Sequence, residues 1–408
     1  GVGRIYAFNT LGCILGSLGC GFVLIGLLGT RGTLLVLSGV NILIGMVILW
    51  GASSRIKKQH LGLGLVVYFF CILGLGIFSP DPFKSSLAKL VRFLSSKYGQ
   101  SAEVYYHREA VEATTTVLGV KDQPLTRNLW INGIGMTSLC LETKLMAHLP
   151  ILLHGNPKDM LTICFGMGTT LRSAWLHQFL QCDVVELVPQ AYECFSYFHQ
   201  DAPLILADPR VRHFVDDGRN FLLVRGKKYD IITMDPSPPL WSAGTVNLYS
   251  QEFLQLARDH LKPDGIMCLW IPPSAFSEVL MIMRTFQSVF PNTLVFRGVQ
   301  YPGLYLLGFN SEQAYRLENF VRISRDQEEI VLRDLNEWGN VFSGKDALLN
   351  LFMLNPAQLA AFVEGEKIIT DDRPHTEFPL LRSLLDDTFR LTLDGNLLAL
   401  LKKRMFKE

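Results

Sequence analysis

The chain has 408 residues and a formal net charge of +1, with 38 basic and 37 acidic side chains. This length is enough for two or three domains, and a net charge near zero gives no reason to expect nucleic acid as a partner. The charged residues are unevenly distributed, because almost all of them follow residue 80. The chain therefore divides into an apolar N-terminal part and a longer part with the composition of a soluble protein.

Three long apolar segments occupy most of the first 80 residues. Residues 5–29, 32–52 and 61–78 contain no Asp, Glu, Lys, Arg or His. Segments of about 18 to 25 apolar residues can cross the hydrocarbon core of a bilayer. We therefore predict three transmembrane helices in residues 1–80, with the lipid bilayer as a partner. Buried helices of a soluble core are the alternative, but three such segments in succession leave no polar face.

The N-terminal residues favour helix contacts and a longer membrane domain. Gly12, Gly16 and Cys20 repeat at the four-residue spacing of small residues that lets transmembrane helices pack closely. The chain begins at Gly1, directly before a predicted span and without the basic start of a signal peptide. We therefore expect further transmembrane helices upstream.

A linker helix and a small sheet are predicted for residues 81–147. Residues 83–98 have the pattern of an amphipathic helix suited to a membrane surface, and residues 103–137 alternate in the manner of antiparallel strands. The apolar face of the helix contains Leu87, Leu90, Val91 and Leu94. The segment from Cys140 to Leu153 then predicts another helix.

Residues 159–235 contain four strand-like segments at the spacing of a βαβαβ unit. Their ends carry a glycine turn with Gly166, Gly168 and Thr169, then Glu186, then Asp216-Asp217-Gly218, and finally Asp235. Ligands of open parallel α/β sheets bind beyond the carboxyl ends of the strands, so all four ends should line one crevice. We predict that this crevice binds a nucleoside-like ligand.

Each strand end suits a different part of such a ligand. Gly166 and Gly168 allow a sharp turn and a close approach of the backbone. Glu186 follows the turn by about 20 residues, where an acidic side chain binds ribose hydroxyls. Asp217 can accept a hydrogen bond from an amine of the base, which leaves Asp235 nearest the reacting end. A ligand-free turn and a turn-capping role for Asp235 remain alternatives.

The remaining segments predict an α/β catalytic domain over residues 148–310 and a helical region over residues 311–408. Further strands at 266–271, 293–297 and 304–309 suit a seven-stranded Rossmann-like sheet. Two segments are candidates for a lid or an acceptor site, and their residues are Trp241, Tyr249, Asp371 and Asp372. The eight cysteines include no C-x-x-C pair and no histidine at zinc spacing, so no metal site is predicted.

The chain resembles the spermidine synthase-like family, in particular the branch in which the polyamine-synthase domain is fused to membrane helices. The resemblance extends over essentially the whole chain. It rests on YAFNTLGCILGSLGCGF (6–22), HLPILLHGNPKDMLTICFGMGTT (148–170), VVELVPQ (184–190), DPRVRHFVDDGRNFL (208–222), YDIITMDPSPP (229–239), LYSQEF (248–253) and ITDDRPHTEF (369–378).

The resemblance implies a seven-stranded S-adenosylmethionine-dependent-transferase fold and a role in polyamine biosynthesis. It implies that Asp235 is the base acting on the attacking amine, that Glu186 holds the ribose and that Asp217 meets the adenine amine. Two family carboxylates are missing, since Pro238 and Thr169 stand at their expected positions. The family's Gln and Tyr have no clear counterpart in residues 134–147. Each of the two missing carboxylates would make a charged hydrogen bond to a cationic amine. Their loss argues against ordinary spermidine synthesis.

Three functions remain open from the sequence. The first is aminopropyl transfer from decarboxylated S-adenosylmethionine to an amine, the second is methyl transfer from S-adenosylmethionine, and the third is non-catalytic binding of a nucleoside or polyamine by a sensor or transport-associated protein. Basic residues on both sides of the third predicted span leave the orientation undecided. We expect a cytosolic catalytic domain in a multi-pass membrane protein, because the cosubstrate is made in the cytosol. Formation of a homodimer is left open.

Overall fold

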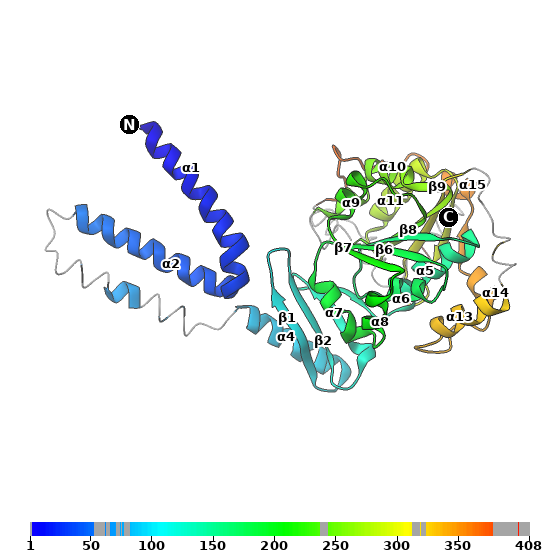
Figure 1. The fold of residues 1–408 in the computed structure, drawn as a ribbon, viewed down its shortest axis with the longest axis horizontal. Helices are drawn as coiled ribbons and strands as arrows, with labels where there is room; N and C mark the ends of the chain where they lie inside the picture. The colour runs from blue at the N-terminus through cyan, green and yellow to red at the C-terminus, as the bar shows by residue number, and fades with distance from the viewer. Residues whose placement is uncertain are drawn as a thin grey trace. The chain divides into compact units, whose positions relative to one another are not determined.

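The computed structural model describes residues 2–52, 62, 66–70, 74, 76, 82–236, 244–311, 319, 324–377 and 399 (Figure 1). The chain forms two compact units. The N-terminal unit contains residues 1–124 and 130–133, and the C-terminal unit contains residues 125–129 and 134–408.

The N-terminal unit begins with a long apolar helical run. Helix α1 (Val2–Leu18) continues through the π-helical turn η1 (Gly19–Leu24) into α2 (Ile25–Ala52). Within this run, the stretch Val2–Ile48 is long and apolar enough to cross a membrane, and its most apolar 18-residue window has a mean hydropathy of 2.3. The predicted third span, residues 61–78, falls almost wholly outside the described residues.

A glycine interrupts the helical run where the sequence separates the first two predicted spans. Gly29 has φ 67° and ψ 173°, a conformation that residues with a Cβ atom rarely adopt. The amide of Thr30 donates a hydrogen bond of 2.7 Å to the Glu109 carboxylate, which caps the helix that restarts after the break. Residues 2–52 therefore form two helical arms (Figure 1).

A small sheet follows, with helix α4 (Pro82–Tyr98) packed on it. The strand order is β1-β2-β3-β4, and β1 and β2 are antiparallel. The bounds are β1 Ala102–Glu109, β2 Thr114–Val120, β3 Asn128–Ile131 and β4 Ile134–Ser138, with the 3-10 turn η2 (Pro124–Thr126) between β2 and β3.

The apolar face of α4 does not lie free for a membrane surface, which corrects the expectation from its sequence. Leu94 is buried against Ala102 and Leu118 of the small sheet, and Trp130 packs beside them. Leu87, Leu90 and Val91 join the same cluster. An amphipathic pattern gives the apolar face of a helix but not the partner that covers it.

The C-terminal unit confirms the predicted α/β Rossmann-like fold. In the part of this unit that the structure describes, the sheet has eight strands in the order β12-β10-β11-β9-β8-β5-β6-β7. The strands β7, β6, β5, β8 and β9 are parallel, whereas β11, β10 and β12 pair antiparallel in succession. The bounds are β5 Asp159–Ile163, β6 Gln181–Glu186, β7 Val211–Val215, β8 Tyr229–Met234, β9 Leu261–Ile271, β10 Thr293–Arg297, β11 Leu304–Phe309 and β12 Phe352–Leu354. The seven predicted strands are present, and the short β12 is added in a region that the sequence predicts as mostly helical.

Helices cover both faces of this sheet (Figure 1). Alternate strand residues face opposite sides, as Ile231 packs with α5, α6 and α7 while Ile232 packs with α9, α10 and α11. The bounds are α5 Leu141–His154, α6 Thr169–Trp175, α7 Gln190–Phe198, α8 Ala202–Ala207, α9 Gly218–Val224, η3 Thr245–Leu248, α10 Gln251–Asp259, α11 Phe276–Val289, α13 Arg325–Leu335, α14 Lys345–Leu349 and α15 Pro356–Phe362. Double coverage explains why the central strands are continuously apolar.

Candidate functional site

The carboxyl ends of four neighbouring strands lie side by side along one edge of the large sheet. Ile163 of β5 pairs with Val185 of β6 on one side and with Met234 of β8 on the other. Glu186 in turn pairs with Val215 of β7. The residues that follow these positions therefore meet at the same edge, as the sequence predicts.

The turn after β5 has a left-handed backbone, which favours glycine, at two glycine positions. Gly166 has φ 56° and Gly168 has φ 76°. A Cβ atom on Gly168 would lie 2.3 Å from the ring of Phe195, so a side chain is excluded there by contact as well as by conformation. The turn thus presents bare backbone at the edge of the sheet.

Glu186 holds this turn in place. Its Oε2 accepts hydrogen bonds from the amides of Phe165 at 2.8 Å and Gly166 at 3.3 Å, and its Oε1 accepts one from Val188 at 3.0 Å. Burial raises the pKa of this carboxyl, and the backbone amides act in the opposite direction. The predicted ribose-binding residue is therefore also the residue that shapes the glycine turn.

Asp217 caps helix α9 at the next strand end. Its Oδ1 accepts hydrogen bonds from the amides of Arg219 at 3.0 Å and Asn220 at 2.9 Å. Asp216 accepts from the Asp217 amide at 2.9 Å. Gly218 follows without a side chain because a Cβ atom there would lie 2.4 Å from Ile163. These contacts fix Asp217 at the edge of the sheet through Oδ1 alone.

Asp235 follows β8 and lies in surroundings that disfavour its charge. Burial raises the pKa of its carboxyl to about 7. Within the described residues, its carboxylate accepts no hydrogen bond. Such a carboxyl changes its protonation state near neutral pH, which is the property a general base or acid needs.

The three predicted carboxylates are gathered around one thiol. Burial raises the pKa of Cys164 well above its usual value, and the charges of Glu186, Asp235 and Asp217 add to this effect in that order. Cys164 has φ 69° and stands between β5 and the glycine turn. The side chains that the sequence assigns to ribose, reaction and base therefore lie near one another at the carboxyl edge of the sheet.

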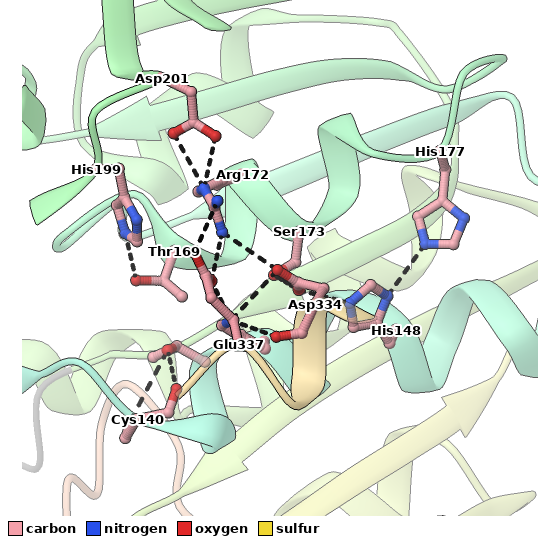
Figure 2. Close-up of polar contacts among 12 residues, drawn as sticks. Cys140, His148, Thr169, Arg172, Ser173, His177, His199, Asp201, Asp334 and Glu337 are labelled. Carbon is pink, nitrogen blue, oxygen red and sulfur yellow. Dashed lines mark hydrogen bonds and ion pairs between the residues drawn. The ribbon is translucent and has the colours of Figure 1, made fainter. Parts of the chain in front are cut away.

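The hydroxyl of Thr169 is not directed to these carboxylates. It lies 2.9 Å from Nε2 of His199 in a buried contact at the start of α6 (Figure 2). The side chain is thus occupied beneath the glycine turn, and only the backbone of Thr169 remains for a ligand.

The candidate lid residues are placed differently from one another. Trp241 lies outside the described residues. Tyr249 is fully buried, and its hydroxyl donates to the carbonyl of Pro236 at 2.9 Å, next to Asp235. Asp371 binds the guanidinium of Arg219 at 2.8 Å, and this ion pair lowers its pKa. Asp372 lies exposed on the following turn. The acidic segment therefore meets α9 on the Asp217 side of the site.

Two further features are not indicated by the sequence. Glu142, at the start of α5, is buried and accepts hydrogen bonds from three consecutive amides of the loop before β11. Lys144 and Asp334 form a buried ion pair between α5 and α13. Both depend on contacts between distant segments, and their local sequence shows only a charged residue near apolar ones. Within the described residues, no group of three His, Cys, Asp or Glu side chains is placed to hold a metal ion.

The matches to known proteins agree with this architecture. A profile for the spermine/spermidine synthase domain matches residues 139–296. The polyamine aminopropyltransferase of Thermotoga maritima is 30% identical over 202 residues, which cover 47% of this chain and 67% of that protein. The chain belongs to the spermine/spermidine synthase family.

Other relatives give the same family over a partial length. The polyamine aminopropyltransferase of Aeropyrum pernix is 28% identical over 198 residues, which span 46% of this chain and 58% of the relative. The crystal structure of spermidine synthase from Thermotoga maritima has a TM-score of 0.50 at 22% identity, covering 62% of this chain and 84% of that one. A spermidine synthase solved with the transition-state analogue AdoDATO has a TM-score of 0.51 at 22% identity, covering 62% and 85%. These structures share the fold of the C-terminal part.

Proposed function

We propose that this protein is an aminopropyltransferase that uses decarboxylated S-adenosylmethionine and an amine acceptor. The observation that carries the proposal is the placement of Glu186, Asp217 and Asp235 at the carboxyl ends of neighbouring strands, along one edge of the sheet. Membership in the spermine/spermidine synthase family supports the same reaction class.

The site has suitable groups for the nucleoside part of the cosubstrate. Glu186 and Asp217 each accept backbone hydrogen bonds and keep further lone pairs that can accept from ribose hydroxyls and from the adenine amine. The bare turn at Gly166 and Gly168 allows the backbone to approach the ligand. We assign the ribose to Glu186 and the base to Asp217.

The reaction needs a positioned nucleophile and a proton acceptor. The acceptor nitrogen attacks the carbon bound to the sulfonium, a C–N bond forms, and the C–S bond breaks with its electron pair left on sulfur as methylthioadenosine. The attacking amine, whose usual pKa is about 10.4, must lose a proton. Asp235, with its pKa raised to about 7, is suited to accept this proton at the reacting end of the site.

We further propose that the helices of residues 2–52 anchor the enzyme in a membrane, with the catalytic domain in the cytosol. The stretch Val2–Ile48 has the length and composition for a crossing, and its most apolar part has no buried residue. An anchored catalytic domain would draw its cosubstrate from the cytosol.

Methyl transfer from S-adenosylmethionine is the second candidate, and the glycine turn favours it. The residue within the turn is Met167, and the hydroxyl of Thr169 is bound to His199. No described side chain of this turn can therefore bind the aminopropyl ammonium as a carboxylate would. A turn without an acidic side chain does not repel the carboxylate that intact S-adenosylmethionine carries and its decarboxylated form lacks.

Product analysis tests the proposal against this candidate. The full chain in detergent is incubated with decarboxylated or intact S-adenosylmethionine and a panel of amines. Methylthioadenosine release that depends on an amine supports aminopropyl transfer, whereas S-adenosylhomocysteine release supports methyl transfer. Release of neither product with any amine would contradict both.

A further inference from the structure

Glu142 is a buried carboxylate with one oxygen fully engaged and the other without a partner. Its Oε1 accepts hydrogen bonds from the amides of Val299 at 2.9 Å, Gln300 at 2.6 Å and Tyr301 at 3.0 Å. Its Oε2 is buried and contacts no hydrogen-bond donor among the residues that the structure describes. Three amides on one oxygen hold the carboxylate in a single orientation.

The register of the sheet places Glu142 at the same edge as Asp235. Met234 of β8 pairs with Leu269 of β9, and Ile271 of β9 pairs with Leu304, the first residue of β11. The loop 298–303 that holds Glu142 therefore lies just beyond the carboxyl end of β9, beside the strand that ends at Asp235.

The charges of Glu142 and Asp235 both raise the pKa values of two neighbouring side chains, Cys140 and Tyr305. Burial raises the pKa of Cys140 to about 12, with further increases from the charges of Glu142 and Asp235. Burial also raises the pKa of Tyr305, and Glu142 and Asp235 again add to it. The hydroxyl of Tyr305 donates to the backbone carbonyl of Glu142 at 3.1 Å. Because Tyr305 stands in β11 beside β9, and β9 pairs with β8, Glu142 lies at the same end of the sheet as Asp235.

An unpaired carboxylate oxygen in such a region is costly unless a ligand satisfies it. A buried charged acceptor without a donor loses the hydration that it has in the unfolded chain. Glu142 cannot turn Oε2 toward the amides without giving up the bonds to Oε1. Oε2 is suited to a donor that carries a positive charge and arrives with the substrate.

We propose that Glu142 Oε2 binds a primary ammonium group of the substrate beside Asp235. The inference rests on the proposed aminopropyl transfer and names its recognition chemistry, a primary alkylammonium held by a charged hydrogen bond. Two substrates carry this group, the amine acceptor and the aminopropyl arm of decarboxylated S-adenosylmethionine. Glu142 supplies an anion at a site where Thr169 supplies none.

Calorimetric titration of the full chain in detergent tests this role with the variant Glu142→Gln. The glutamine oxygen can still accept from the three amides, so the variant should fold, and its thermal unfolding is measured first. The probes are methylthioadenosine, which has no ammonium group, decarboxylated S-adenosylmethionine, and putrescine, cadaverine, agmatine and spermidine in the presence of methylthioadenosine.

Loss of the charged acceptor should weaken binding of an ammonium-bearing probe by about 10- to 100-fold and leave methylthioadenosine unchanged. Weaker binding of decarboxylated S-adenosylmethionine assigns Glu142 to the aminopropyl arm, and weaker binding of an amine assigns it to the acceptor. Glu142→Asp keeps the charge and should retain more of this affinity than Glu142→Gln. It also serves as the second variant if Glu142→Gln unfolds.

Asp230→Asn is the matched control. Asp230 is a buried carboxylate that also accepts from two backbone amides, those of Lys158 and Asp159, but it stands at the start of β8, on the opposite edge of the sheet from Asp235. This variant should bind every probe as the wild type does.

The outcomes separate this inference from the proposed function. Equal binding of all ammonium probes by wild type and Glu142→Gln would overturn the role of Glu142, as would a wild type that binds none of them or a variant that loses methylthioadenosine equally. Binding that depends on Glu142 without any turnover would support the inference and contradict the proposed transfer. Turnover that is indifferent to Glu142 would do the reverse.

Discussion

Lys144 of α5 and Asp334 of α13 form an ion pair with 3.3 Å between Nζ and Oδ1, and neither side chain is more than 1% exposed. Lys144 Nζ also binds Glu337 at 2.6 Å and lies 3.8 Å from the ring centroid of Trp338. His148 and Ser173 bind the other oxygen of Asp334 at 2.8 and 2.7 Å (Figure 2). The ion pair thus holds α13 against α5 and α6. The charged atoms of both Lys144 and Asp334 have partners.

Breaking this pair should destabilise the protein strongly. Asp334→Asn leaves Lys144 buried with a weaker set of acceptors, and removal of one member of a buried pair costs about 3–5 kcal/mol. Urea unfolding of the full chain in detergent measures the change. Lys121→Ala, which removes an exposed pair with Glu103 at 3.9 Å, is the control and should change the stability by less than about 1 kcal/mol. Similar changes in the free energy of unfolding for both variants would show that the buried pair stabilises the protein no more than an exposed pair does.

The buried histidines of this network predict a loss of stability in mild acid. Burial, followed by the charges of Arg172 and Lys144, lowers the pKa of His199 to about 3. In the unfolded chain a histidine has a pKa of about 6.5, so between pH 6.5 and pH 3 only the unfolded state binds the proton. His199 alone should therefore lower the free energy of unfolding by about 2 kcal/mol between pH 7 and pH 5.

Urea unfolding of wild type and His199→Gln at several pH values isolates this contribution. Burial also lowers the pKa of His177 to about 3, so the variant should keep part of the pH dependence. The slope of stability against pH should be smaller in His199→Gln than in the wild type. Identical slopes of stability against pH in the wild type and in His199→Gln would mean that the pKa of His199 is not lowered in the folded protein.

The sequence predicts the elements of the large sheet well because their signals are local. Strands at 293–297 and 304–309 are found at the predicted positions, since continuous apolar runs bounded by turn residues identify buried strands. The glycine turn and the acidic strand ends can likewise be identified from a few consecutive residues each. Their convergence at one edge then follows from the parallel topology of βαβ units.

The unpredicted features depend on contacts between distant residues. Lys144 and Asp334 are separated by 190 positions, and no local pattern connects them. The partner of Thr169 is His199, which the sequence does not distinguish from a surface histidine. The three-residue strand β12 is too short to show an alternation. Side-chain direction is decided by the packing of whole elements, which the linear pattern does not contain.

Membrane attachment predicts the behaviour of the full chain in cells. The apolar helical run of residues 2–52 should keep the protein in the membrane pellet after high-speed centrifugation, and detergent should release it. Alkaline carbonate should not extract it, because the attachment is hydrophobic rather than electrostatic. Recovery of the intact chain in the supernatant without detergent would contradict the membrane proposal.

Glu186 should control nucleoside affinity through both the ribose and the glycine turn. Glu186→Ala removes the acceptor for the ribose and also releases the amides of Phe165 and Gly166. We expect binding of methylthioadenosine to weaken by about 1.5–3 kcal/mol or more, the usual size for a charged hydrogen bond. Glu186→Gln retains an oxygen for the turn and should lose less. Calorimetric affinities equal to that of the wild type in both variants would remove Glu186 from the site.

Asp235 should carry the proton transfer, and its raised pKa gives the direction of the pH dependence. A base must be ionised to accept a proton, so turnover should rise with pH and reach half of its maximum near the pKa of about 7 that burial gives this carboxyl. Asp235→Asn keeps the shape but removes the base, and turnover should fall by about 10² to 10⁴ while methylthioadenosine affinity changes little. The measurement is the rate of methylthioadenosine release from decarboxylated S-adenosylmethionine between pH 5.5 and pH 9, using the amine that the wild type accepts best. Equal turnover by Asp235→Asn would exclude the proposed base.

Putrescine should be a poor acceptor, because Pro238 stands where the family has a carboxylate and Thr169 is engaged with His199. The same assay of methylthioadenosine release, with putrescine as the amine, measures this. Efficient use of putrescine by the wild type would show that the missing carboxylates matter less than their charge suggests.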